Sequence, residues 1–282
     1  MPMRARSLAA LNPGGFHRIT YTEWGAPERP ALVCVHGMTR NGRDFDVLAA
    51  ALESDWRIVC PDVVGRGRSD WLTDHRNYGY PQYLADMTAL LARLDVDGVD
   101  WVGTSMGGLI GMMLAAQPGT PIRRLVINDI GPFIPKAFLE RLRDYVGKDP
   151  HFADLTALER YLREVHAPFG ALDDNQWRHL AEHSARPLPG GGFGLAYDPA
   201  IARAAFTAEE PEDVEMWEIW ERVACPVLVL RGAESDLLLP ETVARMTASK
   251  PGCEIAEIEG CGHAPALMDE SQISLIRTWL ER

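Results

Sequence analysis

Short apolar runs alternate with amphipathic stretches along the first part of the chain. Residues 31–35 and 57–60 are compact apolar runs typical of strands buried on both faces, and residues 16–24 alternate like an edge strand. Residues 44–52 and 83–94 instead carry apolar side chains at helical spacing. Because strands that alternate with helices are joined by crossover connections, the pattern predicts an α/β fold with a mostly parallel sheet.

The pattern changes after a further strand expected at residues 124–127. From about residue 134 to residue 223 the chain has helical stretches broken by Pro and Gly, and no buried strand pattern. Strand character returns at residues 227–230, and a last amphipathic helix is expected near the end of the chain. We therefore expect a core formed by residues 1–132 and 224–282, with a helical cap inserted at residues 133–223.

One short motif in this pattern carries chemistry. Gly103-Thr104-Ser105-Met106-Gly107 has the form Gly-X-Ser-X-Gly, and it lies between a strand-like run at 99–102 and a helix-like run at 109–116. In a nucleophile elbow the serine occupies a strained strand-to-helix turn, where larger side chains two positions away would collide. Ser105 is therefore the candidate nucleophile.

A serine hydroxyl needs a base, and the base needs a carboxylate that orients it. Of the eight histidines, His263 follows the last predicted strand in a glycine-rich loop, where it can reach the carboxyl edge of the sheet. For the acid we choose Asp236, which follows a predicted strand and gives the chain order Ser105, Asp236, His263. Asp129 is a rival, because it ends the strand after the elbow helix and could also approach the base.

Acyl transfer also needs backbone donors for the developing oxyanion. The amide of Met106, directly after the nucleophile, is expected to be one donor. His36-Gly37 ends the buried run at 31–35 and supplies a flexible turn, which points to the amide of Met38 as the second donor. We interpret His36 as a brace for this loop and not as the base.

The composition of the chain bears on what the protein can bind and on its cellular compartment. The 282 residues include 40 acidic and 28 basic side chains, for a formal net charge of −12, so nucleic acid and anionic membranes are poor partners. The five cysteines are an odd number without zinc-type spacing, which favours a reduced, cytoplasmic compartment. No apolar stretch approaches transmembrane length or resembles a signal peptide.

Taken together, the motifs resemble the α/β-hydrolase superfamily, of the esterase and lactonase type with a helical cap. They occur in family order over nearly the whole chain: His36-Gly37, Asp62 to Ser69, Gly103 to Gly108, Gly232 to Pro240, and Gly262-His263. The resemblance implies an eight-stranded, mostly parallel sheet flanked by helices. It argues against epoxide hydrolases and haloalkane dehalogenases of this fold, which use aspartate where Ser105 stands.

The expected activity is hydrolysis of a small-molecule ester or lactone through an acyl-enzyme, without metal or organic cofactor. A C–C bond hydrolase, a cofactor-free perhydrolase and a small-molecule receptor on the same fold are the alternatives. Arg40, Trp177 and Trp217 are candidate substrate-binding residues. Arg40 could instead form an ion pair with Asp44, and cap aromatics could simply pack the cap onto the core. The sequence leaves the oligomeric state and the substrate open.

Overall fold

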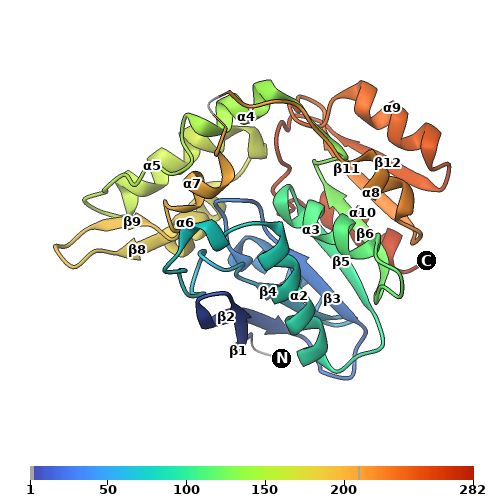
Figure 1. The fold of residues 1–282 in the computed structure, drawn as a ribbon, viewed down its shortest axis with the longest axis horizontal. Coiled ribbons are helices and arrows are strands. Elements are labelled where there is room, and N and C mark those ends of the chain that lie inside the picture. Colours follow the sequence, from blue (N-terminus) through green and yellow to red (C-terminus); the bar gives the residue numbers. More distant parts are fainter. Residues whose placement is uncertain (1–2, 209) are drawn as a thin grey trace.

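The computed structural model describes residues 3–208 and 210–282, and its centre is an eight-stranded sheet (Figure 1). The strand order is β1-β2-β4-β3-β5-β6-β11-β12. β1, β2 and β4 pair antiparallel, whereas the neighbours from β4 to β12 run parallel. The predicted mostly parallel, eight-stranded sheet is therefore confirmed. Its strands are β1 (Arg4–Asn12), β2 (Gly15–Trp24), β3 (Ala31–Val35), β4 (Arg57–Pro61), β5 (Val99–Thr104), β6 (Ile122–Asn128), β11 (Val227–Gly232) and β12 (Cys253–Ile258).

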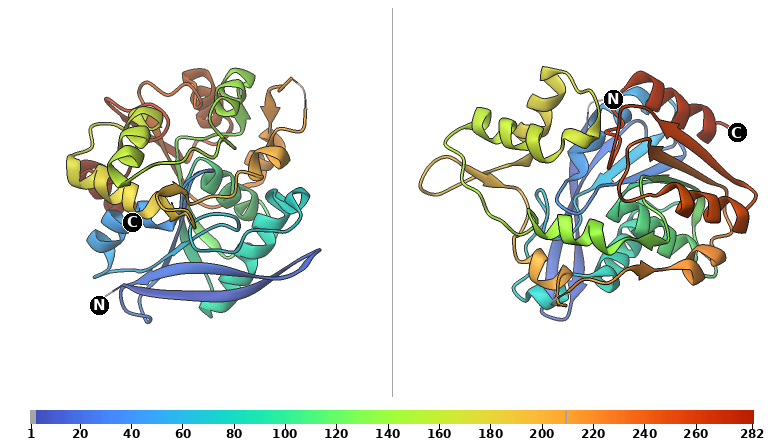
Figure 2. Two further views of the ribbon diagram at one scale, coloured as in Figure 1. Left: turned by 90° about the vertical axis from the view of Figure 1, so that its left-hand side faces the viewer. Right: turned by 90° about the horizontal axis from the view of Figure 1, so that it is seen from above.

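The edge of the sheet differs from the expectation. β2, predicted as the edge strand, pairs with β4 on one side and with β1 on the other. β1 and β2 form a long antiparallel pair at the margin of the molecule (Figure 2). Most side chains of β1 are exposed or half-buried, so its sequence lacks the apolar alternation by which a strand is recognised.

Helices cover both faces of the sheet and divide the core in two. Along β3 the odd-numbered residues pack in one apolar cluster and Leu32 and Cys34 pack in the other, as the period of a strand requires. Two helices, α1 and α10, supply the second cluster, whereas α2, α3 and α9 pack against the first. Their bounds are α1 (Asp46–Leu52), α2 (Tyr80–Leu94), α3 (Met106–Ala115), α9 (Pro240–Ser249) and α10 (Glu270–Leu280).

Residues 133–223, here named the insertion, lie between β6 and β11. Helices α4 to α7 gather on one side of the molecule with β8 and β9, whereas α8 lies apart from them and packs against α3 (Figure 1). The predicted helical character holds, but two small two-stranded sheets, β7 with β10 and β8 with β9, were not expected. The elements are β7 (Phe133–Ile134), α4 (Lys136–Arg143), α5 (Leu155–Val165), α6 (Asp174–Ser184), β8 (Ala185–Pro187), β9 (Phe193–Leu195), α7 (Ile201–Ala205), β10 (Val214–Glu215) and α8 (Trp217–Arg222).

Two further observations concern the expected compartment. Within the two described ranges, no helix combines the length and the apolar character needed to cross a bilayer. The five cysteines are free thiols, and four of them are buried. The cytoplasmic location stays a prediction.

Candidate active site

The carboxyl end of β5 positions the candidate nucleophile. Ser105 follows β5 and precedes α3 with a backbone φ of 51°, in the left-handed region that non-glycine residues rarely adopt. Its amide donates a hydrogen bond to the carbonyl oxygen of Asn128 at the end of β6 (2.9 Å). A Cβ atom on Gly103 would lie 2.3 Å from the carbonyl carbon of Gly107, so glycine is required there. The turn has the strained form expected of a nucleophile elbow.

Ser105, His263 and Asp129 form one hydrogen-bonded chain. His263 lies in the loop after β12, and its Nε2 is 3.0 Å from the hydroxyl oxygen of Ser105. Its Nδ1 is 2.8 Å from Oδ2 of Asp129, which follows β6 directly. Because an ionised carboxylate only accepts hydrogen bonds, Nδ1 carries the ring proton and the Nε2 lone pair faces the hydroxyl group. The chain is thus arranged to take a proton from Ser105.

The choice of Asp236 as the acid is wrong in this geometry. Asp236 does not contact His263; its carboxylate is half-exposed and accepts a hydrogen bond from Nη2 of Arg141 (2.9 Å). Asp129, the rival in the sequence, occupies the position instead. Both residues follow neighbouring parallel strands, β6 and β11, so chain order alone does not decide which carboxylate reaches the base.

Donors from the end of β11 and from the loop after it hold the carboxylate of Asp129 in place. Asp129 is fully buried, with 0% of its surface exposed. Oδ1 accepts a hydrogen bond from the amide of Gly232 (2.8 Å), and Oδ2 accepts one from the hydroxyl group of Ser235 (2.6 Å). Buried charges are tolerated only when they are hydrogen-bonded, and these two bonds satisfy that need. The loop that was expected to supply the acid therefore supplies its supports.

The two residues expected to form the oxyanion hole lie beside Ser105. Met38 and Met106 both line the cavity onto which Ser105 opens. A Cβ atom on Gly37 would be 3.7 Å from Cβ of Ser105, so the turn before Met38 directly adjoins the nucleophile. The role of the two amides as donors stays a prediction.

His36 braces this turn, in keeping with the interpretation of the sequence. Its Nε2 accepts a hydrogen bond from the amide of Val63 (2.9 Å), and its Nδ1 is 2.7 Å from the carbonyl oxygen of Gly37. Burial lowers the pKa of His36 to about 4, so the ring is neutral at physiological pH. It links β3 to the loop after β4 and lies outside the chain of Ser105.

Arg66 supports both candidate donors and was not singled out from the sequence. Its side chain is fully buried, and Nε donates a hydrogen bond to the carbonyl oxygen of Met38 (2.8 Å). Nη2 is 3.5 Å from the sulfur of Met106, and Nη1 donates to the hydroxyl oxygen of Tyr83 (3.0 Å). No described carboxylate forms an ion pair with it. The family motif around residues 62–69 gives no signal for this role, because Arg66 stands at one of its variable positions.

A cavity of about 260 Å³ opens in front of Ser105 and His263. Half of the residues that line it belong to the insertion, including Phe138 and Phe169. The rings of Phe138 and His263 pack in a T-shaped arrangement, with centroids 4.9 Å apart. The lining is mostly apolar, as in pockets that bind small organic molecules. The site can therefore hold an aliphatic ligand against the nucleophile.

The three candidate substrate-binding residues have different positions. Arg40 lines the cavity, and its Nε and Nη2 both donate to Asp44 (2.8 and 2.7 Å), so the alternative ion pair is present. Trp177 and Trp217 do not line the cavity, and this expectation is corrected. Trp177 lies on the buried face of α6. The guanidinium carbon of Arg245 in α9 lies 3.8 Å from the centre of the Trp217 ring in α8. Both tryptophans therefore contribute to packing between elements.

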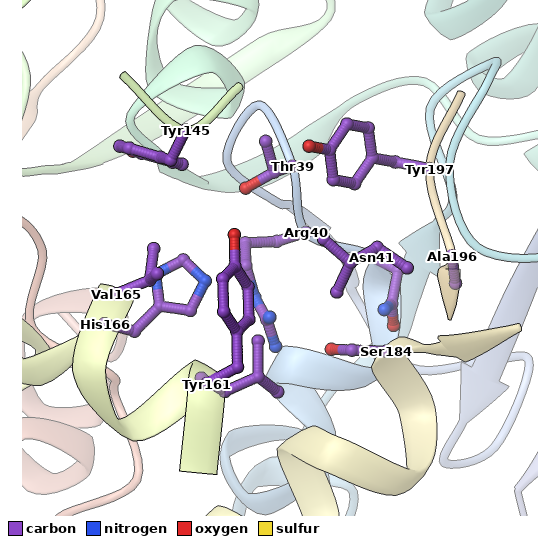
Figure 3. A pocket seen from close by; sticks show the side chains of 12 residues that line it. Thr39, Arg40, Asn41, Tyr145, Tyr161, Val165, His166, Ser184, Ala196 and Tyr197 are labelled. Carbon is purple, nitrogen blue, oxygen red and sulfur yellow. The ribbon is translucent and has the colours of Figure 1, made fainter. Parts of the chain in front are cut away.

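A smaller space adjoins the cavity and shares Arg40 with it as a lining residue; Figure 3 shows the side chains around this space. Its volume is about 10 Å³, which is room for roughly one water molecule. His166 borders both spaces and stacks on Phe169, with ring centroids 4.6 Å apart. Burial lowers the pKa of His166 well below its ordinary value, so it adds no positive charge to the cavity at neutral pH.

Three residues with ligand atoms suited to a metal ion lie away from the cavity. The ligand atoms of Asp46, His179 and His183 are within 4.8 Å of one another. Arg43 already donates to Oδ2 of Asp46 through its Nε (2.7 Å), and Nε2 of His179 is 2.9 Å from the Arg43 carbonyl oxygen. A cation there would meet the guanidinium charge, so we assign the cluster no part in the chemistry of Ser105.

Comparisons with known proteins agree with this architecture. Residues 32–272 match the sequence model of the alpha/beta hydrolase family. The chain is 46% identical to the 3-hydroxybutyrate-oligomer hydrolase of Cupriavidus necator over 277 residues, covering 95% of this chain and 94% of that protein. Among solved structures, an alpha/beta hydrolase from Novosphingobium aromaticivorans has 37% identity and a TM-score of 0.87, covering 99% of this chain and 98% of that one. A protein from Rickettsia typhi has 33% identity and a TM-score of 0.92, covering 100% of this chain and 99% of that one. This chain is therefore a hydrolase that belongs to the alpha/beta hydrolase family.

Proposed function

We propose that the protein is a serine esterase that cleaves the ester bonds of short linear oligomers of 3-hydroxybutyrate. The observation that carries the proposal is the hydrogen-bonded chain of Ser105, His263 and Asp129 at the wall of a largely apolar cavity. The substrate class rests on the 46% identical relative, whose name specifies oligomers of this hydroxy acid. Such oligomers are aliphatic esters, and the apolar lining suits their methyl-bearing chains.

In the proposed acylation step, Ser105 Oγ attacks the ester carbonyl carbon while His263 Nε2 takes its proton. Asp129 keeps the ring in the tautomer that has Nε2 free, and it stabilises the positive charge that forms on the ring. The amides of Met38 and Met106 donate to the oxyanion. His263 then gives the proton to the departing alcohol oxygen, and the acyl group remains on Ser105.

In the second step, water replaces the alcohol. His263 takes a proton from this water as it attacks the acyl carbonyl carbon, and the proton returns to Ser105 as the acid leaves. Phe138 of α4 packs against the His263 ring, so the insertion limits the access of bulk water. We propose that the insertion acts as a cap over the site in this way.

The proposal is tested with purified protein and the linear 3-hydroxybutyrate dimer and trimer, with released monomer measured by chromatography. Ser105→Ala is expected to lower kcat by at least roughly 10⁴-fold, because the nucleophile is removed. Intact-protein mass spectrometry after a serine-reactive phosphonate should show one adduct on the unmodified protein and none on Ser105→Ala. Equal, negligible turnover by both proteins would contradict the proposed substrate.

A substrate panel separates the alternatives. Hydrolysis of lactones or of a vinylogous diketone without hydrolysis of the oligomers would favour a lactonase or a C–C hydrolase with the same site. Tight binding of a small molecule without turnover, together with a missing phosphonate adduct, would favour a receptor. Folding of each variant is checked by circular dichroism, so that loss of structure is not mistaken for loss of chemistry.

A further inference from the structure

The charged side chains that line the cavity are positive. Among the described residues that line it, Arg40 and Arg141 carry positive charge, and no Asp or Glu side chain is present. This contrasts with the whole chain, which has 40 acidic and 28 basic residues. A lining of this kind favours a ligand that carries negative charge. The proposed oligomers carry such a charge, because each linear chain ends in a free carboxylate.

The two arginines differ in how strongly their own partners hold them. The side chain of Arg40 is 5% exposed, and its guanidinium group is bonded through two nitrogens to Asp44, so its charge is neutralised locally. The side chains of Arg141 and Asp236 are 35% and 52% exposed. Their pair has one hydrogen bond, and the second contact, from Nε, lacks hydrogen-bond geometry. Exposed pairs of this type contribute about 0–1 kcal/mol, so Arg141 can exchange its partner.

The position of Arg141 relative to His263 suggests which part of a substrate it meets. Phe138 and Arg141 are three residues apart in α4 and share one face of the helix. The guanidinium carbon of Arg141 lies 4.8 Å from the centre of the Phe138 ring, and that ring makes a T-shaped contact with His263. Arg141 therefore lies one aromatic ring beyond the base, on the wall formed by the insertion.

The chemistry places the leaving alcohol beside the same histidine ring. His263 Nε2 must give its proton to the departing oxygen, so that oxygen lies beside the His263 ring during the reaction. In a 3-hydroxy acid a short carbon link joins the hydroxyl oxygen to the carboxylate. A leaving alcohol that is itself the last unit of the oligomer therefore brings its carboxylate toward Phe138 and Arg141.

We propose that Arg141 binds the carboxylate of the acid-terminal unit, so that the enzyme removes hydroxy acids one at a time from the acid end of the chain. This inference rests on the proposed function. The substrate carboxylate replaces Asp236 at the guanidinium group. The ester bond between the carbonyl carbon and the alcohol oxygen of the last unit breaks, that oxygen takes the proton from His263, and the shortened acyl chain stays on Ser105 until water releases it.

The direct test compares the 3-hydroxybutyrate dimer with its methyl ester, which lacks the charge. For the unmodified protein the free acid is expected to have the lower KM. Arg141→Gln should raise KM for the free acid by about tenfold or more, the size expected for one charge-assisted hydrogen bond, and should leave KM for the methyl ester unchanged. Asp236→Asn should lower KM for the free acid, because the competing carboxylate is removed. Arg143→Gln, which makes the same charge change on α4 away from the cavity, is the matched control.

A second readout reports the direction of cleavage without kinetic constants. A trimer acetylated on its terminal hydroxyl group is digested briefly, and the first products are identified by mass spectrometry. Cleavage at the acid end gives acetylated dimer and free monomer. Acetylated monomer and free dimer as the first products would overturn the proposal, as would an equal rise in KM for acid and methyl ester in Arg141→Gln.

Experiments can distinguish a failure of the Arg141 carboxylate site from a failure of the proposed substrate. If the oligomers are not hydrolysed at all, acetylated 3-hydroxybutyrate and its methyl ester replace them as probes with the same leaving alcohol. A preference for the acid that Arg141→Gln abolishes would keep the carboxylate site and discard the oligomer as substrate. Hydrolysis of oligomers with no preference for the free acid would keep the proposed function and discard the site.

Discussion

At the scale of single residues, replacing Asp129 and replacing Asp236 should have different effects on kcat: a large loss for Asp129 and little change for Asp236. Asp129→Asn replaces the acceptor of the His263 Nδ1–H group by a neutral amide, which favours the wrong ring tautomer. Loss of an acid in this role lowers kcat by roughly 10⁴-fold in a serine protease. Asp236→Asn should keep kcat within about twofold on a neutral p-nitrophenyl ester, because Asp236 contacts Arg141 and not the base. Steady-state kinetics of both variants on that ester distinguish the two carboxylates, and the reverse outcome would restore Asp236 as the acid.

Arg66 carries a second prediction at this scale. Its Nε fixes the carbonyl oxygen of Met38, and its buried positive charge lies near the expected oxyanion. Arg66→Met should lower kcat more than it raises KM, by less than the roughly 10²–10³-fold cost of deleting an oxyanion donor. Affinity for a boronic acid, which forms a tetrahedral adduct on serine, should fall in parallel.

The control for Arg66 is its exposed neighbour Arg68. Arg68→Met changes the charge by the same amount in the same turn without reaching Met38, so its kcat and boronic acid affinity should stay near those of the unmodified protein. If Arg66→Met lowers only the melting temperature, Arg66 is a structural residue and does not position the oxyanion site.

The sequence could predict Ser105 and His263 because each lies in a local pattern with a mechanical meaning. A Gly-X-Ser-X-Gly turn fixes where the nucleophile must stand, and a histidine after the last strand is carried to the same edge of the sheet. The acid has no such local pattern. Whether Asp129 or Asp236 meets the base depends on how the loop after β11 turns. That loop directs Ser235 toward Asp129, and the amide of Gly232 at the end of β11 also points there.

At the scale of elements, the elbow between β5 and α3 depends on close backbone approach. A Cβ atom on Gly107 would lie 2.0 Å from the carbonyl oxygen of Val35 in β3. Because both partners belong to the buried centre of the sheet, neither can move aside. Gly107→Ala should lower the free energy of unfolding by roughly 3 kcal/mol or more, measured by urea denaturation.

Gly190 provides the control for this substitution. It has no neighbouring atom within 4 Å of a built Cβ and no unusual φ, so Gly190→Ala should leave the free energy of unfolding within about 0.5 kcal/mol. Equal stabilities of the Gly107 and Gly190 variants would show that α3 can move away from β3, which the contacts around the elbow oppose.

Elements with a clear period were predictable, and those without one were not. The helical spacing noted at residues 83–94 falls within α2, because the apolar side chains there recur on one face of a helix. The short strands β7 to β10 have two or three residues each, too few to show alternation. Trp177 and Trp217 could not be assigned to the cavity or to helix packing from sequence, since both environments use the same side chains.

At the scale of the whole molecule, buried histidines make stability depend on pH. The pKa of His36 is lowered to about 4 by burial, and burial also lowers the pKa of His166 well below its ordinary value. The unfolded chain binds a proton on such a residue near pH 6.5, whereas the folded chain does not. The free energy of unfolding should therefore be fully maintained above pH 6.5 and should decrease as the pH falls toward 4.

His36 isolates this effect, because its ring is buried and its environment is defined by two hydrogen bonds. A pKa near 4 in place of 6.5 corresponds to about 3 kcal/mol between pH 7.5 and pH 4. His36→Gln should be less stable than the unmodified protein at pH 7.5, because its contacts to Gly37 and Val63 are altered. Its free energy of unfolding should nevertheless fall less steeply between pH 6.5 and pH 4, because the unfolded variant has one histidine fewer to protonate.

Buried Asp62 has a raised pKa, and its effect on the pH dependence of stability is opposite to that of His36. Because Asp62 is present in both proteins, its effect cancels in the comparison. Urea unfolding at a series of pH values measures the two slopes, and parallel slopes would contradict a neutral, buried His36.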